Sequence, residues 1–86
     1  MPEISRFFGI IIRMYFDDHD PAHFHAIYGE AEALISVTPI QVLHSDLPGR
    51  ALSMVLEWTA LHQSELLSNW QRLHTAQSAQ KIAPLA

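Results

Sequence analysis

The sequence predicts an α+β fold in which an antiparallel sheet of three or four strands is followed by one long helix or two consecutive helices packed on one face. Two observations lead to this prediction. The first half of the chain holds segments of β-branched and aromatic residues, several of them alternating with polar residues, between short turns. After residue 46 the apolar residues recur at the spacing of a helix.

The overall composition is that of one small globular domain. The 86 residues are 49% hydrophobic and 16% charged. We expect this domain to span residues 1–80 and residues 81–86 to form a C-terminal tail, on which Ile82 and Leu85 are the side chains able to dock. A core this small leaves little stability to spare, so a homodimer or a protein partner is expected.

Hydrophobic patterning and turn residues define the expected strands. Residues 8–16 are rich in β-branched and aromatic side chains, which predicts the first strand. The three aspartates and one proline of residues 17–22 predict a turn. Beyond this turn, alternating segments predict strands at residues 23–28 and 31–37, and a shorter strand is predicted at residues 40–43.

The change of period predicts the helical layer. Ser45 or Asp46 is suited to cap the first helix, because each side chain can accept a hydrogen bond from a free backbone N–H. Ser64, just before an apolar pair, is suited to cap a second helix. The pattern leaves two alternatives open: one helix over residues 47–75, or two helices broken near residues 62–64.

The charge and the residue content argue against several functions and types of site. The formal net charge is −4, and the five lysine and arginine residues are scattered, whereas tight nucleic-acid binding draws on clustered basic residues. An RNA partner is therefore disfavoured. The absence of cysteine excludes disulfides and thiolate metal sites. Without a signal-peptide pattern or an apolar run that could span a bilayer, a cytoplasmic protein with no membrane contact is expected.

Three of the six histidines, His19, His23 and His25, fall within seven residues, and this window is the first candidate for function. On the predicted strand His23 and His25 are separated by one residue, so both imidazoles point to the same face. His19 lies just before the strand, and Glu30, or an aspartate of the preceding turn in its place, offers a carboxylate. Imidazole and carboxylate groups are typical zinc ligands, so one hypothesis is a divalent metal site made of these four residues.

Acid–base catalysis is the second interpretation of the same window. A metal-independent nuclease can use one histidine as base or acid, and a cation to stabilise the developing charge on a phosphate. His23 and His25 would transfer protons, and Arg13 on the neighbouring strand would contact the phosphate. A third interpretation is purely structural: one histidine bonds a backbone group of the aspartate-rich turn, and the other is solvated.

A family resemblance extends over nearly the whole chain. The matching segments are Met1–Ser5, Phe7–Ile10, Arg13–Tyr15, Asp18-His19, Pro21–His25, Tyr28–Glu30, Leu47-Pro48, Arg50–Leu52, Val55–Trp58, Leu61-His62, Glu65–Leu67, Asn69-Trp70 and Lys81–Leu85. With them the chain resembles a small bacterial family of uncharacterised proteins, catalogued as domain of unknown function four-one-six-zero. Ala22 departs from the pattern, since a second proline is common there.

The resemblance implies a genetic context more than a chemistry. Genes of this family often stand beside those of a second small family, in an arrangement like a toxin–antitoxin module. It therefore implies a toxin-like component with an antitoxin-like protein partner, acting on RNA through the histidine site. Two alternatives remain open: a metal-binding protein, and a non-catalytic interaction module that uses the helical face with Trp58 or Trp70.

Overall fold

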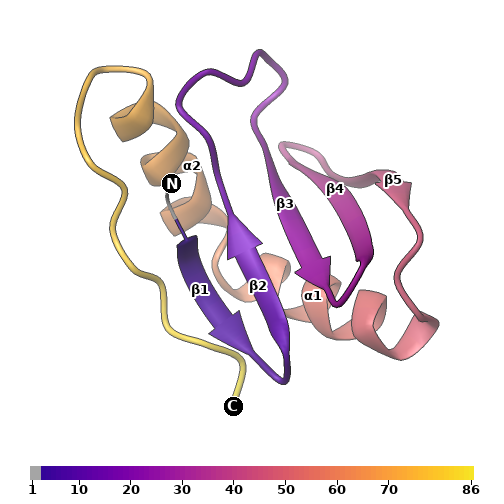
Figure 1. Ribbon diagram of the computed structural model, residues 1–86. Coiled ribbons are helices and arrows are strands. Elements are labelled where there is room, and N and C mark those ends of the chain that lie inside the picture. The colour runs from indigo at the N-terminus through magenta and orange to yellow at the C-terminus, as the bar shows by residue number, and fades with distance from the viewer. Residues whose placement is uncertain (1–2) are drawn as a thin grey trace.

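The computed structural model describes residues 3–86 and has five antiparallel strands followed by two helices (Figure 1). The strands are β1 (Glu3–Phe7), β2 (Ile10–Arg13), β3 (His23–Tyr28), β4 (Ala31–Val37) and β5 (Ile40–Ser45). The helices are α1 (Gly49–Leu61) and α2 (Gln63–Leu73). Each strand pairs with its neighbour in sequence, so the sheet is a meander in the order β1-β2-β3-β4-β5. The predicted α+β fold is confirmed, with one strand more than expected.

The additional strand arises because residues 8–16 do not form one strand. Phe8 and Gly9 have φ angles of 51° and 80° and form the tight turn between β1 and β2. Two consecutive residues with positive φ are characteristic of a type I′ hairpin turn, which usually carries Asn-Gly. The Phe-Gly pair of this chain lacks that signature, and the hairpin was therefore not predicted from the sequence.

One face of the sheet is covered by the helices, which lie behind it in Figure 1. Alternate side chains of each central strand enter the core, among them Phe24 and Ala26 of β3. Trp58 of α1 is fully buried against this face, with its ring centroid 5.3 Å from that of Phe7 and 5.8 Å from that of Phe24. Trp70 of α2 is also buried. Both tryptophans thus belong to the core.

The helical layer consists of two helices and not one. The break lies at His62, whose φ and ψ of −123° and 25° are outside the helical range. The expected caps have other roles: Asp46 accepts a hydrogen bond from the Glu32 backbone N–H at 2.6 Å, and Ser45 accepts one from Leu47 at 3.1 Å. Helix α1 instead begins after Pro48, without a side-chain cap. Within residues 3–86, neither helix is long and apolar enough to cross a membrane.

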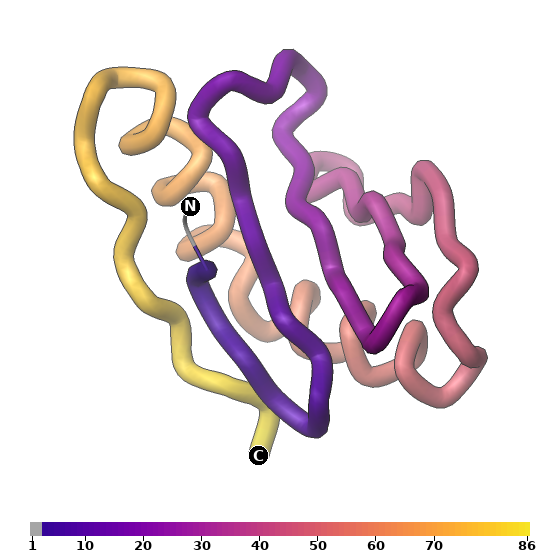
Figure 2. Tube along the Cα trace, in the orientation of Figure 1, coloured from indigo at the N-terminus to yellow at the C-terminus, as the bar shows by residue number. Residues whose placement is uncertain are grey.

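The C-terminal segment runs back along β1, as the yellow end of the tube in Figure 2 shows. The Ile82 N–H donates to the Ile4 carbonyl at 2.8 Å, and the Trp58 indole N–H donates to the Ala83 carbonyl at 2.9 Å. Asn69 forms two hydrogen bonds of 2.8 Å with the backbone of Gln80. Ile82 is 5% exposed and joins the core. This segment therefore covers the edge of the sheet at β1.

Replacing Phe8 with asparagine is expected to stabilise the fold. A bulky residue at positive φ costs about 1–3 kcal/mol, whereas asparagine adopts this region more readily. The Phe8 ring is 59% exposed, so little burial is lost. We expect Phe8→Asn to raise the free energy of unfolding in urea by about 1 kcal/mol. Phe16→Asn, at a 68% exposed residue with ordinary φ, is the control and should bring no gain.

Removing the Ile82 side chain is expected to destabilise the whole domain. Ile82→Ala leaves a cavity beneath the C-terminal segment and should lower the free energy of unfolding by about 2–4 kcal/mol. Lys81→Ala, at the exposed neighbouring residue, should change it by less than about 0.5 kcal/mol. A transition midpoint equal in the two variants would show that the segment contributes nothing to stability.

Candidate metal centre

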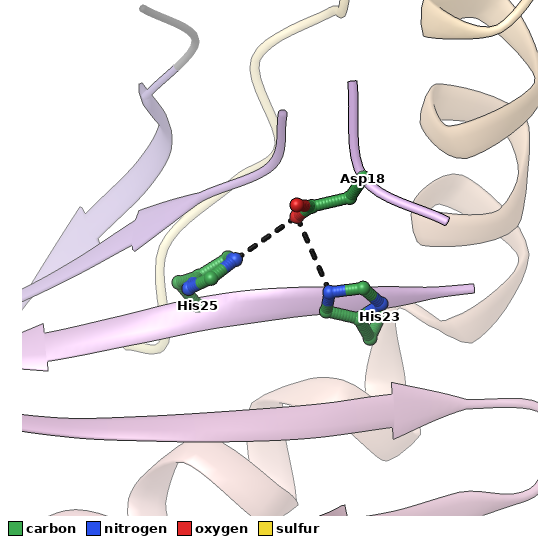
Figure 3. A group of neighbouring side chains, drawn as sticks. All are labelled: Asp18, His23 and His25. Carbon is green, nitrogen blue, oxygen red and sulfur yellow. Dashed lines mark hydrogen bonds and ion pairs between the residues drawn. The ribbon is translucent and has the colours of Figure 1, made fainter. Parts of the chain in front are cut away.

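The candidate site lies where the loop between β2 and β3 passes over the start of β3. Because Phe24 and Ala26 enter the core, the alternate residues His23 and His25 project from the opposite face of β3. The loop brings Asp18 above them, and its carboxylate points toward both rings (Figure 3). Strand alternation and one loop thus bring together three side chains that carry possible metal ligands.

The geometry of the cluster is tight. One carboxylate oxygen, Asp18 Oδ2, lies 3.2 Å from His23 Nε2 and 3.0 Å from His25 Nε2. The three ligand atoms all lie within 4.8 Å of one another. The side chains of His23, His25 and Asp18 are 14%, 18% and 26% exposed, so the cluster is shielded but still accessible.

The remaining ring nitrogens of both histidines are held by oxygen acceptors. The Nδ1–H of His23 donates to the Pro21 carbonyl at 2.8 Å. The Nδ1–H of His25 donates to Glu32 Oε2 at 2.9 Å. These contacts place the proton of a neutral imidazole on Nδ1 in each ring. Both Nε2 lone pairs are then directed toward Asp18.

Aromatic rings limit the movement of the two histidines. Tyr15 contacts His25 edge-on, with centroids 4.8 Å apart and an interplanar angle of 80°. Trp70 lies 5.4 Å from His23 between ring centroids. Ring contacts of this kind restrict side-chain rotation, so the orientation of the cluster is set by packing as well as by hydrogen bonds.

His74, at the end of α2, holds the loop that carries Asp18. Its Nε2–H donates to the Asp18 carbonyl and its Nδ1–H to the Trp70 carbonyl, both at 2.8 Å. Two carbonyl acceptors require two N–H donors, which only the imidazolium form supplies. Accordingly, the hydrogen bonds to the Asp18 backbone and then to the Trp70 backbone raise the pKa of His74 above its usual value. Sequence reasoning missed this role, because a contact across 56 residues leaves no local signal.

The residues expected at the site from the sequence are only partly gathered. Within the described residues 3–86, the metal-compatible group contains His23 and His25 but neither His19 nor Glu30, which are both exposed. Glu30 follows the far end of β3, in the turn to β4. Arg13 is the cross-strand partner of His25 in the β2–β3 pairing, so it stands beside the cluster.

Glu32 was not predicted as a site residue, and Asp18 was not distinguished from the other aspartates of its turn. A signal for Glu32 existed: a hairpin turning at Gly29-Glu30 pairs Glu32 with Ile27, two residues beyond His25 on the same face. Asp18 had no comparable signal, because the course of the loop decides which of its three aspartates approaches the histidines.

Comparison with known proteins yields one match. The model of a family described as a domain of unknown function (DUF4160) matches residues 9–71, well over half of the chain. The matched region contains Asp18, His23, His25 and Glu32, while His74 lies just beyond it. No curated protein and no solved structure is significantly similar to the chain.

Proposed function

This protein belongs to the DUF4160 family, whose function is unknown, and we propose that it binds a divalent transition-metal ion through Asp18, His23 and His25. One observation carries the proposal: both histidines direct Nε2 at the same carboxylate oxygen while an acceptor holds each Nδ1–H. Metal-bound histidines usually donate their second ring N–H to a carboxylate or a backbone carbonyl, and here one histidine has each kind of partner.

The hydrogen-bond inventory supports a cation at the centre. Each imidazole already donates Nδ1–H, so a hydrogen bond from Nε2 to Asp18 requires a second proton on each ring. Two imidazolium rings would then face one carboxylate, with their centroids 5.5 Å apart. A single divalent ion in place of both Nε2 protons keeps the two rings neutral and removes their mutual repulsion.

Distances and ligand types fit a first-row transition metal. Ligands bound at about 2.1 Å to one tetrahedral ion lie about 3–4 Å apart, and the two N–O distances of 3.2 and 3.0 Å match this spacing. Two nitrogens and one oxygen suit Zn²⁺ or Fe²⁺ better than Mg²⁺ or Ca²⁺, which prefer oxygen alone. Three protein ligands leave a position for water or substrate, as in catalytic sites. A metal in such a site can lower the pKa of a bound water to near neutrality.

The acid–base alternative, a metal-independent nuclease, has less support from the geometry. His25 has both ring nitrogens within 3.0 Å of carboxylate oxygens, so neither nitrogen is directed at a substrate. Arg13 stands beside His25, where its guanidinium would hold an anion bound near the metal ion. A toxin-like role would be supported if expression of the protein arrested growth and the substitution His25→Ala relieved that arrest.

Metal binding by the intact chain is the direct test. We expect tag-free protein to bind one Zn²⁺ per chain in calorimetric titration and in elemental analysis after dialysis. His25→Ala removes a ligand and should weaken binding by more than about 100-fold. His44→Ala, at an exposed histidine of β5, is the control and should bind as the wild type does. Binding that is substoichiometric in the wild type, or equal in the wild type and His25→Ala, would contradict the proposal.

The partner of the His25 Nδ1–H provides a second prediction. Glu32→Ala removes the acceptor that orients this ring and should weaken Zn²⁺ binding by about 10–100-fold while one ion per chain is still bound. Glu30→Ala, two residues away at the exposed turn, is the matched control and should leave affinity unchanged. A larger loss in Glu30→Ala than in Glu32→Ala would instead make Glu30 a ligand, as the sequence suggested.

A further inference from the structure

A pocket lies at the opposite end of β3 from His23 and His25. This pocket has a volume of about 470 Å³ and is lined by Phe8, Tyr28, Pro48, Arg50, Ala51 and Met54. Its volume falls within the range of about 300–1,000 Å³ that is usual for small-molecule sites. The lining residues come from the β1–β2 turn, the end of β3 and the start of α1, which meet at the lower end of Figure 1.

Two aromatic residues that line the pocket are exposed to solvent. Phe8 is 59% and Tyr28 is 40% exposed, although both are large enough to contribute to a core. A Cβ atom at Gly9 would lie 3.3 Å from Tyr28 Cε1, so the glycine lets the tyrosine ring rest against the turn. Phe8 occupies positive φ, where asparagine or glycine would be less strained. The fold thus holds two aromatic rings at the pocket, one of them at a cost to the backbone.

The charge of the pocket is positive although the chain as a whole is acidic. Arg50 is exposed, and the six lining residues include no acid. The other three arginines are engaged elsewhere: Arg6 pairs with Glu3 at 2.9 Å, Arg13 stands beside His25, and Arg72 donates to the Ser78 carbonyl at 2.7 Å. The first turn of α1, at the pocket, contains no acidic residue, so no carboxylate of that turn neutralises Arg50.

We propose that this pocket binds a small aromatic anion, of the chemical class of a nucleoside monophosphate. Phe8 and Tyr28 supply apolar faces for a planar ring, and Met54 adds a polarisable apolar surface. Arg50 pairs with the phosphate through its guanidinium donors. The pocket is larger than an inorganic anion requires, and its one cationic residue, Arg50, suits a ligand with one anionic group. The pocket is separate from the candidate metal centre, because Tyr28 and His23 stand at opposite ends of β3.

Calorimetric titration of the full chain with adenosine monophosphate, in metal-free buffer, tests this proposal. We expect saturable binding at one site with a Kd below about 1 mM, and at least about tenfold weaker binding of adenosine and of inorganic phosphate. Absence of saturable binding, or equal binding of adenosine and its monophosphate, would overturn the proposal. Tighter binding of a short oligonucleotide with the same 5′-phosphate would assign the pocket to nucleic acid and overturn the small-molecule assignment.

Two variants locate the binding to the pocket. Arg50→Gln should weaken monophosphate binding about tenfold and leave the weak binding of adenosine unchanged, with Arg6→Gln as the control. Phe8→Asn should weaken the binding of both adenosine monophosphate and adenosine. Because this variant is expected to be more stable than the wild type, a loss of binding would not reflect unfolding. Phe16→Asn is the matched control on an exposed ring outside the pocket. Wild-type affinity in both Arg50→Gln and Phe8→Asn would overturn the proposal.

Discussion

The packing of Trp58 against the sheet is the interaction on which the rest of this structure depends. Its fully buried ring contacts the aromatic rings of β1 and β3, and its indole N–H donates to the C-terminal segment through the Ala83 carbonyl. One side chain thus connects the sheet, α1 and the segment that covers β1. Burial of a side chain of this size is a large part of the stability of so small a domain.

The same packing decides which residues face outward. Phe24 must point toward Trp58, and the alternation of a strand then turns His23 and His25 to the other face. The histidines are therefore presented by a central strand anchored in the core through Phe24 and Ala26, while His23, at the start of the strand, also contacts Trp70 of α2. Rigid elements position ligands more precisely than loops do, which suits a site whose ligand atoms must lie within a few tenths of an ångström of their ideal places.

The loop that carries Asp18 is the less rigid part of the site, and its position depends on distant residues. His74 binds the Asp18 carbonyl, and Trp70 packs between His74 and His23, with centroid distances of 4.2 and 5.4 Å. The end of α2 thus serves as a support for the loop. Since α2 begins only after the break at His62, the direction of the second helix matters for the geometry of the site as well as for the core.

Several structural features were predictable from the sequence, and others were not. Strand alternation predicted that His23 and His25 share a face, and the change to helical spacing predicted the covering layer. The Phe8–Gly9 turn was missed, because a phenylalanine at positive φ runs against the ordinary preferences of that residue. Asp18 was not singled out among its neighbouring aspartates, because the path of a loop depends on what anchors it.

By itself, then, the sequence determined the local properties of this protein: the period of its strands and helices, the faces of its side chains, and its membership in a family. Only the tertiary structure decided that Asp18, Glu32 and His74 would meet the two histidines, and that residues 80–83 would cover β1. The physical reason is the separation along the chain over which each kind of interaction acts. Backbone preferences act between near neighbours, whereas register, loop path and docking follow from contacts between residues far apart in the chain.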